Sequence, residues 1–105
     1  MLNCVIVDDE QFSVEAIRKY IDMVPRLNIV GIYTDPQAAL EQVSSEKEVD
    51  VLFMDIDMPN MSGLELARAL RSKTQKLIFT TAHSKYAFEA YEVEGDAYLL
   101  KPFTF

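Results

Sequence analysis

The chain has little of several features that would place it in a specialised class. It has a single cysteine, Cys4, so no disulfide framework or cysteine-rich metal site can be built from it. Cys4 lies in an apolar run, which favours a buried thiol over a nucleophile, in a reducing compartment. No apolar run approaches the ~20 residues of a membrane span, and the start, MLNCVIVDDE, lacks the pattern of a signal peptide. These absences predict a soluble, cytoplasmic protein.

Glycine, proline and basic residues are also scarce. The three glycines and four prolines occur singly, so the chain has neither a flexible linker nor the G-x-G-x-x-G or Walker A loops that bind nucleotide phosphates. Ten basic residues against seventeen acidic ones give a net charge of −7, which argues against nucleic-acid binding by this segment. The 105 residues suffice for one domain with its own core.

Short apolar runs alternate with stretches in which apolar residues have helical spacing. The runs carry almost no charge, which is typical of strands buried on both faces. We expect strands near 2–7, 28–33, 50–55, 76–81 and 97–100, and helices near 10–23, 36–46, 62–72 and 84–93. This alternation predicts an α/β fold with a parallel sheet. Because no fifth helix follows the last strand, we expect one sheet face near the first and fifth strands to lack a covering helix.

Five polar residues sit at or just past the ends of these runs. They are Asp8, Asp9, Asp55, Thr81 and Lys101. Parallel strands with right-handed crossovers all point the same way, so their carboxyl ends share one edge, where open α/β sheets bind ligands. The sequence therefore predicts that three carboxylates, a hydroxyl and an ammonium meet at one site. Taken alone, Asp8 and Asp9 could also be solvated acids of a turn.

The chemistry of this group favours phosphoryl transfer. Carboxylates this close raise one another's pKa unless a cation intervenes, and Mg²⁺ suits a site with few carboxylates and a phosphate. Lys101 offers a flexible positive charge for a phosphate, and Thr81 a neutral donor. Such groups stabilise a phosphoryl group in flight while a carboxylate attacks it. The predicted product is an aspartyl phosphate.

These residues resemble the receiver domains of bacterial two-component response regulators. The resemblance covers essentially the whole chain and consists of four motifs in order: Asp8-Asp9; the D-x-x-M-P-x-x-x-G stretch from Asp55 to Gly63; Thr81-Ala82; and Lys101-Pro102. It implies a flavodoxin-like, doubly wound sheet of five parallel strands in the order 2-1-3-4-5. It also implies a signalling domain, and not an enzyme acting on a separate substrate.

The resemblance also implies a role for each matching residue. Asp55 would accept the phosphoryl group from a phosphohistidine of a sensor histidine kinase. Mg²⁺ would be held by Asp9, Asp55 and the Asp57 main-chain carbonyl, and by Asp8 through a water. Thr81 and Lys101 would bond the phosphoryl oxygens, Tyr98 would rotate inward as a second switch residue, and Pro102 would follow a cis bond. From the residues alone, the favoured reading of Tyr98 is a core aromatic with a hydrogen-bonded hydroxyl, and His83 could border the phosphate or cap a helix.

The stretch FTTAH and the later KYAFEAYEVEGDAYLLKPF resemble the subfamily whose receiver precedes a LytTR-type DNA-binding domain. That resemblance implies a transcription regulator whose output domain lies outside this chain, with a homodimer formed on phosphorylation. Asp55-x-Asp57 with Thr81 and Lys101 also resembles the haloacid-dehalogenase phosphatases, although their metal acids follow the lysine. A receiver-like interaction module that takes no phosphate is a third reading.

Overall fold

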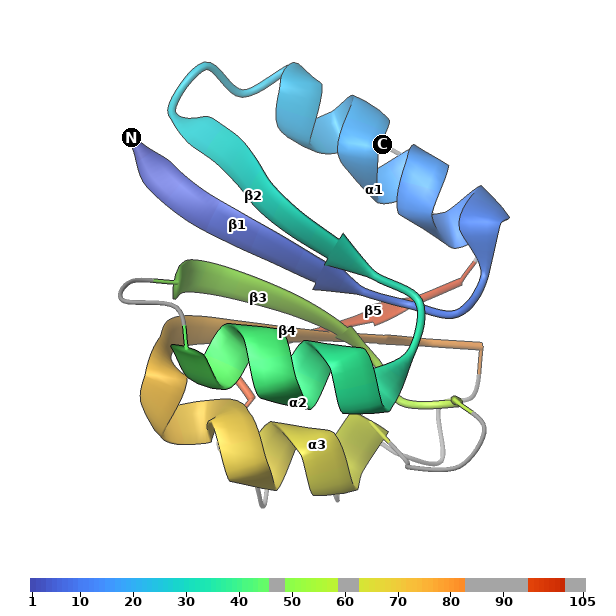
Figure 1. Cartoon of the computed structure of the whole chain (residues 1–105). Helices are drawn as coiled ribbons and strands as arrows, with labels where there is room; N and C mark the ends of the chain where they lie inside the picture. The colour runs from blue at the N-terminus through green and yellow to red at the C-terminus, as the bar shows by residue number, and fades with distance from the viewer. Residues whose placement is uncertain (46–48, 59–62, 83–94, 102–105) are drawn as a thin grey trace.

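The computed structural model describes residues 1–45, 49–58, 63–82 and 95–101, and shows one parallel sheet between two helical layers (Figure 1). The strands are β1 (Leu2–Val7), β2 (Leu27–Tyr33), β3 (Val49–Asp55), β4 (Thr74–Thr81) and β5 (Ala97–Leu100). The helices are α1 (Gln11–Asp22), α2 (Pro36–Ser45), α3 (Gly63–Leu70) and a short 3-10 turn, η1 (Arg71–Lys73). The strand order is β2-β1-β3-β4-β5, with every neighbouring pair parallel. The predicted flavodoxin-like sheet is confirmed.

The elements begin and end close to where the sequence predicts. Asp35 caps α2, with its Oδ2 accepting a hydrogen bond from the Ala38 N–H at 3.3 Å. The main differences flank the 3-10 turn: α3 ends at Leu70 instead of near residue 72, and β4 begins at Thr74 instead of near residue 76, because the turn closes at Lys73 and Thr74 is already extended. The expected helix near 84–93 lies outside the described residues.

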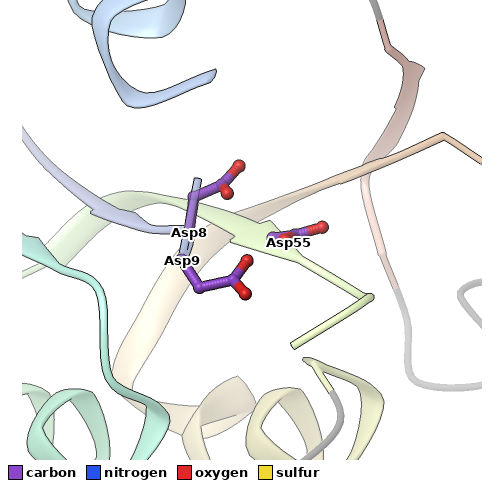
Figure 2. A group of neighbouring side chains, drawn as sticks. All are labelled: Asp8, Asp9 and Asp55. Carbon is purple, nitrogen blue, oxygen red and sulfur yellow. The ribbon is translucent and has the colours of Figure 1, made fainter. Parts of the chain in front are cut away.

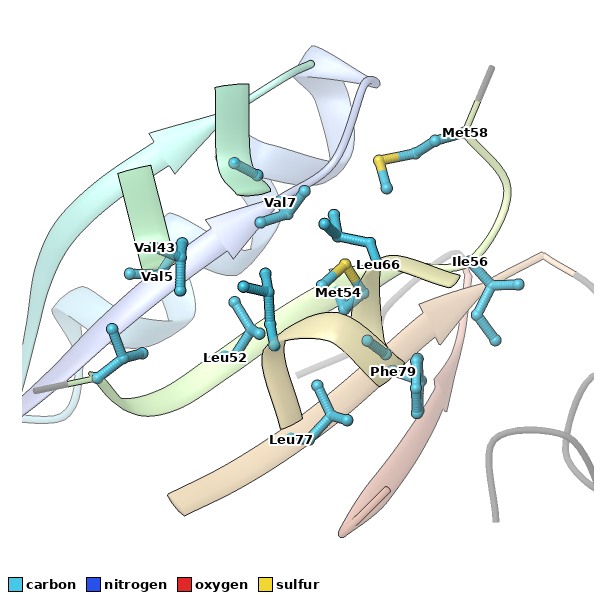
Figure 3. Packing of buried hydrophobic residues seen from close by; sticks show 14 residues of the cluster. Val5, Val7, Val43, Leu52, Met54, Ile56, Met58, Leu66, Leu77 and Phe79 are labelled. Atoms are coloured by element: carbon cyan, nitrogen blue, oxygen red, sulfur yellow. The ribbon is translucent and has the colours of Figure 1, made fainter. Parts of the chain in front are cut away.

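Two hydrophobic layers hold the sheet, one on each face. Alternate residues of β1 point to opposite faces: Val5 and Val7 join the layer under α2 and α3, and Cys4 and Ile6 join the layer under α1. The layer under α2 and α3 is the larger (Figure 3). α1 contributes Val14, Ile17 and Ile21, which recur every three or four residues along one stripe of the helix. Cys4 is buried and free, as predicted.

Among the described residues, the face under α1 is less completely covered than the other. An apolar trough of about 400 Å³ lies between α1 and the edge of the sheet. Its lining comprises Ile17, Tyr20, Leu27, Val51, Phe53, Ile78, Ala97 and Leu99. The trough borders β5, near which the sequence predicted a sheet face without a covering helix, and the described residues leave it open. None of the helices in the described part of the chain is long and apolar enough to cross a membrane.

α3 starts directly against the end of β3, and glycine allows this close approach. The Gly63 N–H donates a hydrogen bond to the Ile56 carbonyl oxygen at 2.9 Å. A Cβ at Gly63 would overlap the Asp55 carbonyl oxygen and lie 2.6 Å from the Ile56 Cα. Both atoms belong to the backbone and cannot turn away, so any larger residue would displace the segment that carries Asp55.

We expect Gly63→Ala to lower the free energy of unfolding by roughly 1–3 kcal/mol, because the backbone must shift to admit the methyl group. Urea unfolding followed by circular dichroism would measure the change. Gly31→Ala is the matched control: its Cβ would meet only the Tyr33 side chain, at 2.8 Å, and that ring can rotate. Equal losses of stability in the two variants would contradict this account.

Candidate functional site

Three carboxylates gather where β1 and β3 end (Figure 2). Val7 pairs with Met54 across the two strands, so the residues that follow, Asp8 and Asp55, are neighbours. One carboxylate oxygen from each of Asp8, Asp9 and Asp55 lies within 4.8 Å of the others. Asp8 and Asp55 are buried, with 0% and 2% of their surface exposed, whereas Asp9 is exposed. The predicted meeting of the three acids is confirmed.

Burial makes this arrangement electrostatically costly. Loss of solvation raises the pKa of Asp8 above its usual range. Burial, together with the negative charge of Asp8, raises the pKa of Asp55 to about 8. Without a further cation, Asp55 therefore keeps a proton near neutral pH.

Lys101 provides the positive charge of the site. Its Nζ lies 3.0 Å from Asp8 Oδ2, 3.4 Å from Glu10 Oε1 and 3.5 Å from Asp55 Oδ1. Burial lowers the pKa of Lys101, but the charges of Asp55 and Asp8 outweigh it, and the net pKa is raised. The ammonium therefore stays charged. When all three aspartates are ionised, one ammonium leaves two of their negative charges uncompensated.

The donor set suits a hard divalent cation such as Mg²⁺. Its side-chain ligand atoms are all carboxylate oxygens, the kind that Mg²⁺ prefers. Within the described residues the buried Oδ2 of Asp8 accepts no hydrogen bond, although its charge faces Lys101, so it has lone pairs left for a ligand. The Asp57 N–H donates to Asp55 Oδ1 at 3.2 Å, which brings the Asp57 main chain against the acid cluster. The residues present therefore fit a magnesium ion.

Thr81 ends β4 and is completely buried beside the loop after β3. Its Oγ1 donates a hydrogen bond to Asp57 Oδ2 at 2.7 Å. Its carbonyl oxygen accepts a hydrogen bond from the Lys101 N–H at 2.8 Å, which joins the ends of β4 and β5. The predicted hydroxyl thus lies in the site, where it donates to the carboxylate two residues after Asp55.

Sequence reasoning missed two contacts. Glu10, at the start of α1, shares the Lys101 ammonium and accepts a hydrogen bond from Ser13 Oγ. The Ser13 hydrogen bond and the charge of Lys101 lower the pKa of Glu10. Its position directly after Asp8-Asp9 was a signal that could have suggested a role. The sequence resemblance gave the Asp57 main-chain carbonyl a role in metal binding, and no sequence pattern pointed to the hydrogen bond between the Asp57 side chain and Thr81.

The other expected residues are partly described. Tyr98 is half-buried in β5 and packs against the larger core layer, and its role as a switch stays a prediction. Pro102 and His83 lie outside the described residues, so the cis bond and the role of the histidine stay predictions.

The family of the chain follows from comparison with known proteins. The chain belongs to the response regulator receiver domain family, whose model matches residues 4–105. It is 36% identical over 103 residues to an "Uncharacterized response regulatory protein" of Vibrio parahaemolyticus, a match covering 97% of this chain and 42% of that protein. It is 31% identical over 105 residues to "Sensory transduction protein LytT" of Bacillus anthracis, covering 98% and 42%. The chain thus spans 42% of these relatives.

Solved structures agree with this family. The response regulatory domain of protein mrkE from Klebsiella pneumoniae has a TM-score of 0.89 at 30% identity, covering 98% of this chain and 85% of that one. Response regulator TrrA from Thermotoga maritima, solved in complex with Mg²⁺ and BeF, has a TM-score of 0.84 at 30% identity, covering 100% and 90%. The chain is therefore a receiver domain of two-component signalling, and the LytT relative fits the predicted subfamily. Family membership decides against the phosphatase alternative.

The raised pKa of Asp55 predicts a pH-dependent stability when no divalent cation is present. Between its ordinary pKa, about 3.9, and a folded-state pKa of about 8, the folded protein keeps a proton that the unfolded chain releases. The free energy of unfolding should therefore fall as pH rises through this window, by at most about 1.4 kcal/mol per pH unit, and level off above it.

Urea unfolding in EDTA at several values between pH 5 and pH 8 would measure this slope. Asp55→Asn should remove most of it, because the amide does not titrate. The same slope in the wild type and in Asp55→Asn would contradict the assignment.

Proposed function

We propose that Asp55 is the residue that accepts the phosphoryl group. The observation that carries this proposal is the placement of a buried carboxylate at the end of β3, beside two further acids and a charged lysine. An Asp55 oxygen would attack the phosphorus of a phosphohistidine on a sensor histidine kinase. The new O–P bond forms as the P–N bond breaks, and the imidazole nitrogen leaves with the bonding electrons.

Mg²⁺ would be held by Asp8, Asp9, Asp55 and the main-chain carbonyl of Asp57. When bound, the ion supplies positive charge that keeps Asp55 ionised and screens the phosphoryl oxygens. The chain's own residues do the rest. Asp8 and Asp9 supply two of the three carboxylates. The Lys101 ammonium lies 3.5 Å from Asp55 Oδ1, where it would pair with a phosphoryl oxygen. The Mg²⁺ and BeF in the TrrA structure support this proposal by similarity.

The modified protein would differ from the unmodified one through Thr81 and Tyr98. A phosphoryl group adds charge and acceptor oxygens at Asp55. Thr81 would move to donate to one of these oxygens, and Tyr98 would turn into the space that Thr81 leaves. A phosphoryl group that stabilises one arrangement of Thr81 and Tyr98 more than the other shifts the population toward the stabilised arrangement.

The receiver would control an output domain that lies outside this chain. The resemblance to the subfamily with a LytTR-type DNA-binding domain supports a C-terminal DNA-binding domain and a role in transcription, and the relative named sensory transduction protein LytT fits that subfamily. We place the protein in the cytoplasm, as a homodimer when phosphorylated, with DNA contacted only through the output domain. Its own catalysis would be confined to transfer of the phosphoryl group onto Asp55 and its later hydrolysis.

Phosphorylation can be tested by intact-mass measurement after incubation with acetyl phosphate and Mg²⁺. We expect a gain of roughly 80 Da in the wild type. No gain is expected with EDTA, because Asp55 then keeps its proton, or in Asp55→Asn, which lacks the attacking oxygen. A stable acyl phosphate in Asp55→Asn would refute the assignment. A folded wild type that never gains mass would favour the module that takes no phosphate.

Thr81→Ala tests the switch separately from the chemistry. The variant should still be phosphorylated on Asp55, because Thr81 is not the nucleophile. Its phosphate-dependent dimerisation should weaken by roughly tenfold, since a charge-assisted hydrogen bond to the phosphoryl group is lost. Analytical ultracentrifugation of the intact regulator, with and without phosphorylation, measures this. Unchanged dimerisation would count against the role of Thr81.

A further inference from the structure

The hydrogen bond between Thr81 and Asp57 joins two residues 24 positions apart and is among the shortest side-chain contacts of the site, at 2.7 Å. Its donor is fully buried at the end of β4, and its acceptor is an exposed carboxylate in the loop after β3. Hydrogen bonds to ionised acceptors are about twice as strong as neutral ones. The hydroxyl thus has a well-defined anionic partner in the unphosphorylated protein.

We propose that the Asp57 side chain acts as a latch, by which we mean that it accepts the Thr81 hydrogen bond in the unphosphorylated protein. This hydrogen bond must break before Thr81 can donate to a phosphoryl group on Asp55. The proposal rests on the proposed function. A hydroxyl carries a single proton to donate, so its hydrogen bond to Asp57 competes directly with one to a phosphoryl oxygen. Asp57 is therefore a positioning residue that acts through Thr81.

The position of Asp57 also explains how the latch would open. Its N–H donates to Asp55 Oδ1 at 3.2 Å, so one residue contacts both the proposed acceptor and the proposed switch. A phosphoryl group on Asp55 would bring negative charge beside the Asp57 carboxylate and at the same time offer Thr81 better acceptors. Phosphorylation of Asp55 would then weaken the hydrogen bond between Thr81 and Asp57 and supply Thr81 with new acceptor oxygens. This role belongs to the Asp57 side chain, and the proposed role in metal binding belongs to its main-chain carbonyl.

Removal of the latch should favour the phosphorylated conformation before any phosphate arrives. In wild type, the free energy of breaking the Thr81 to Asp57 bond reduces the apparent affinity for any phosphoryl mimic. Asp57→Ala removes this competition and the carboxylate charge together. We expect beryllofluoride with Mg²⁺, a mimic of the phosphoryl group, to bind Asp57→Ala about tenfold more tightly. Asp57→Asn, whose amide oxygen accepts a hydrogen bond without the charge, should be intermediate.

Titration calorimetry on the intact protein would give these affinities. Asp22→Ala, which removes an exposed carboxylate from the far end of α1, is the matched control and should bind as wild type does. To separate the latch from simple charge repulsion, the same Asp57→Ala change is made in a Thr81→Ala background. The latch requires that the gain in affinity shrink markedly there, because no hydroxyl remains to be released.

The outcomes distinguish the two proposals. An undiminished gain in the Thr81→Ala background, or equal affinities of wild type and Asp57→Ala, overturns the latch while leaving Asp55 as the acceptor. A folded wild type that does not bind beryllofluoride overturns the proposed function and the latch with it. A tenfold gain that depends on Thr81 supports both.

Discussion

The attraction between the Lys101 ammonium and the buried carboxylates of Asp8 and Asp55 is the interaction on which the site depends. It joins the ends of β1, β3 and β5, three strands that are separated in the sequence and brought together by the sheet order. Two carboxylates with 0% and 2% exposure would be strongly destabilising without an opposite charge nearby. The hydrophobic layers therefore position the acids, and the charge of the lysine lowers the free-energy cost of burying them.

The lysine compensates only part of the negative charge of the three aspartates. In the proposed function, the remaining negative charge would attract a divalent cation, and that cation would keep Asp55 ionised and able to attack phosphorus. The neighbouring polar contacts follow the same logic. Glu10 shares Lys101, and Asp57 accepts the Thr81 hydrogen bond, so both candidate partners of a phosphoryl group are already engaged with other carboxylates. Phosphorylation would exchange partners instead of filling an empty space.

Most of the fold and the acid cluster could be predicted from the sequence, because both depend on backbone regularities. Uncharged runs mark buried strands, and parallel strands bring their carboxyl ends to one edge, which is why Asp8, Asp55 and Lys101 were expected together. The contacts of Glu10 and of the Asp57 carboxylate could not be predicted in the same way. They depend on side-chain rotamers and loop paths at the site, which no periodic pattern encodes. The 3-10 turn before β4 was missed for a similar reason, since its polar residues resemble a helix end.

The edge strand β5 is held differently from the rest of the sheet. Its ends are exposed and its middle residues are half-buried, so apolar burial contributes less here than in β1 or β3. At its start Asp96 pairs with Arg71 and accepts the Leu77 N–H, and after its end Lys101 pairs with the acids. Ionic contacts thus anchor β5 at both ends. The pair at the start of the strand is partly exposed and weakens as salt is added, whereas the pair between Lys101 and Asp8 is buried and is screened much less. Added salt should therefore loosen the start of β5 before the end that carries the site's positive charge.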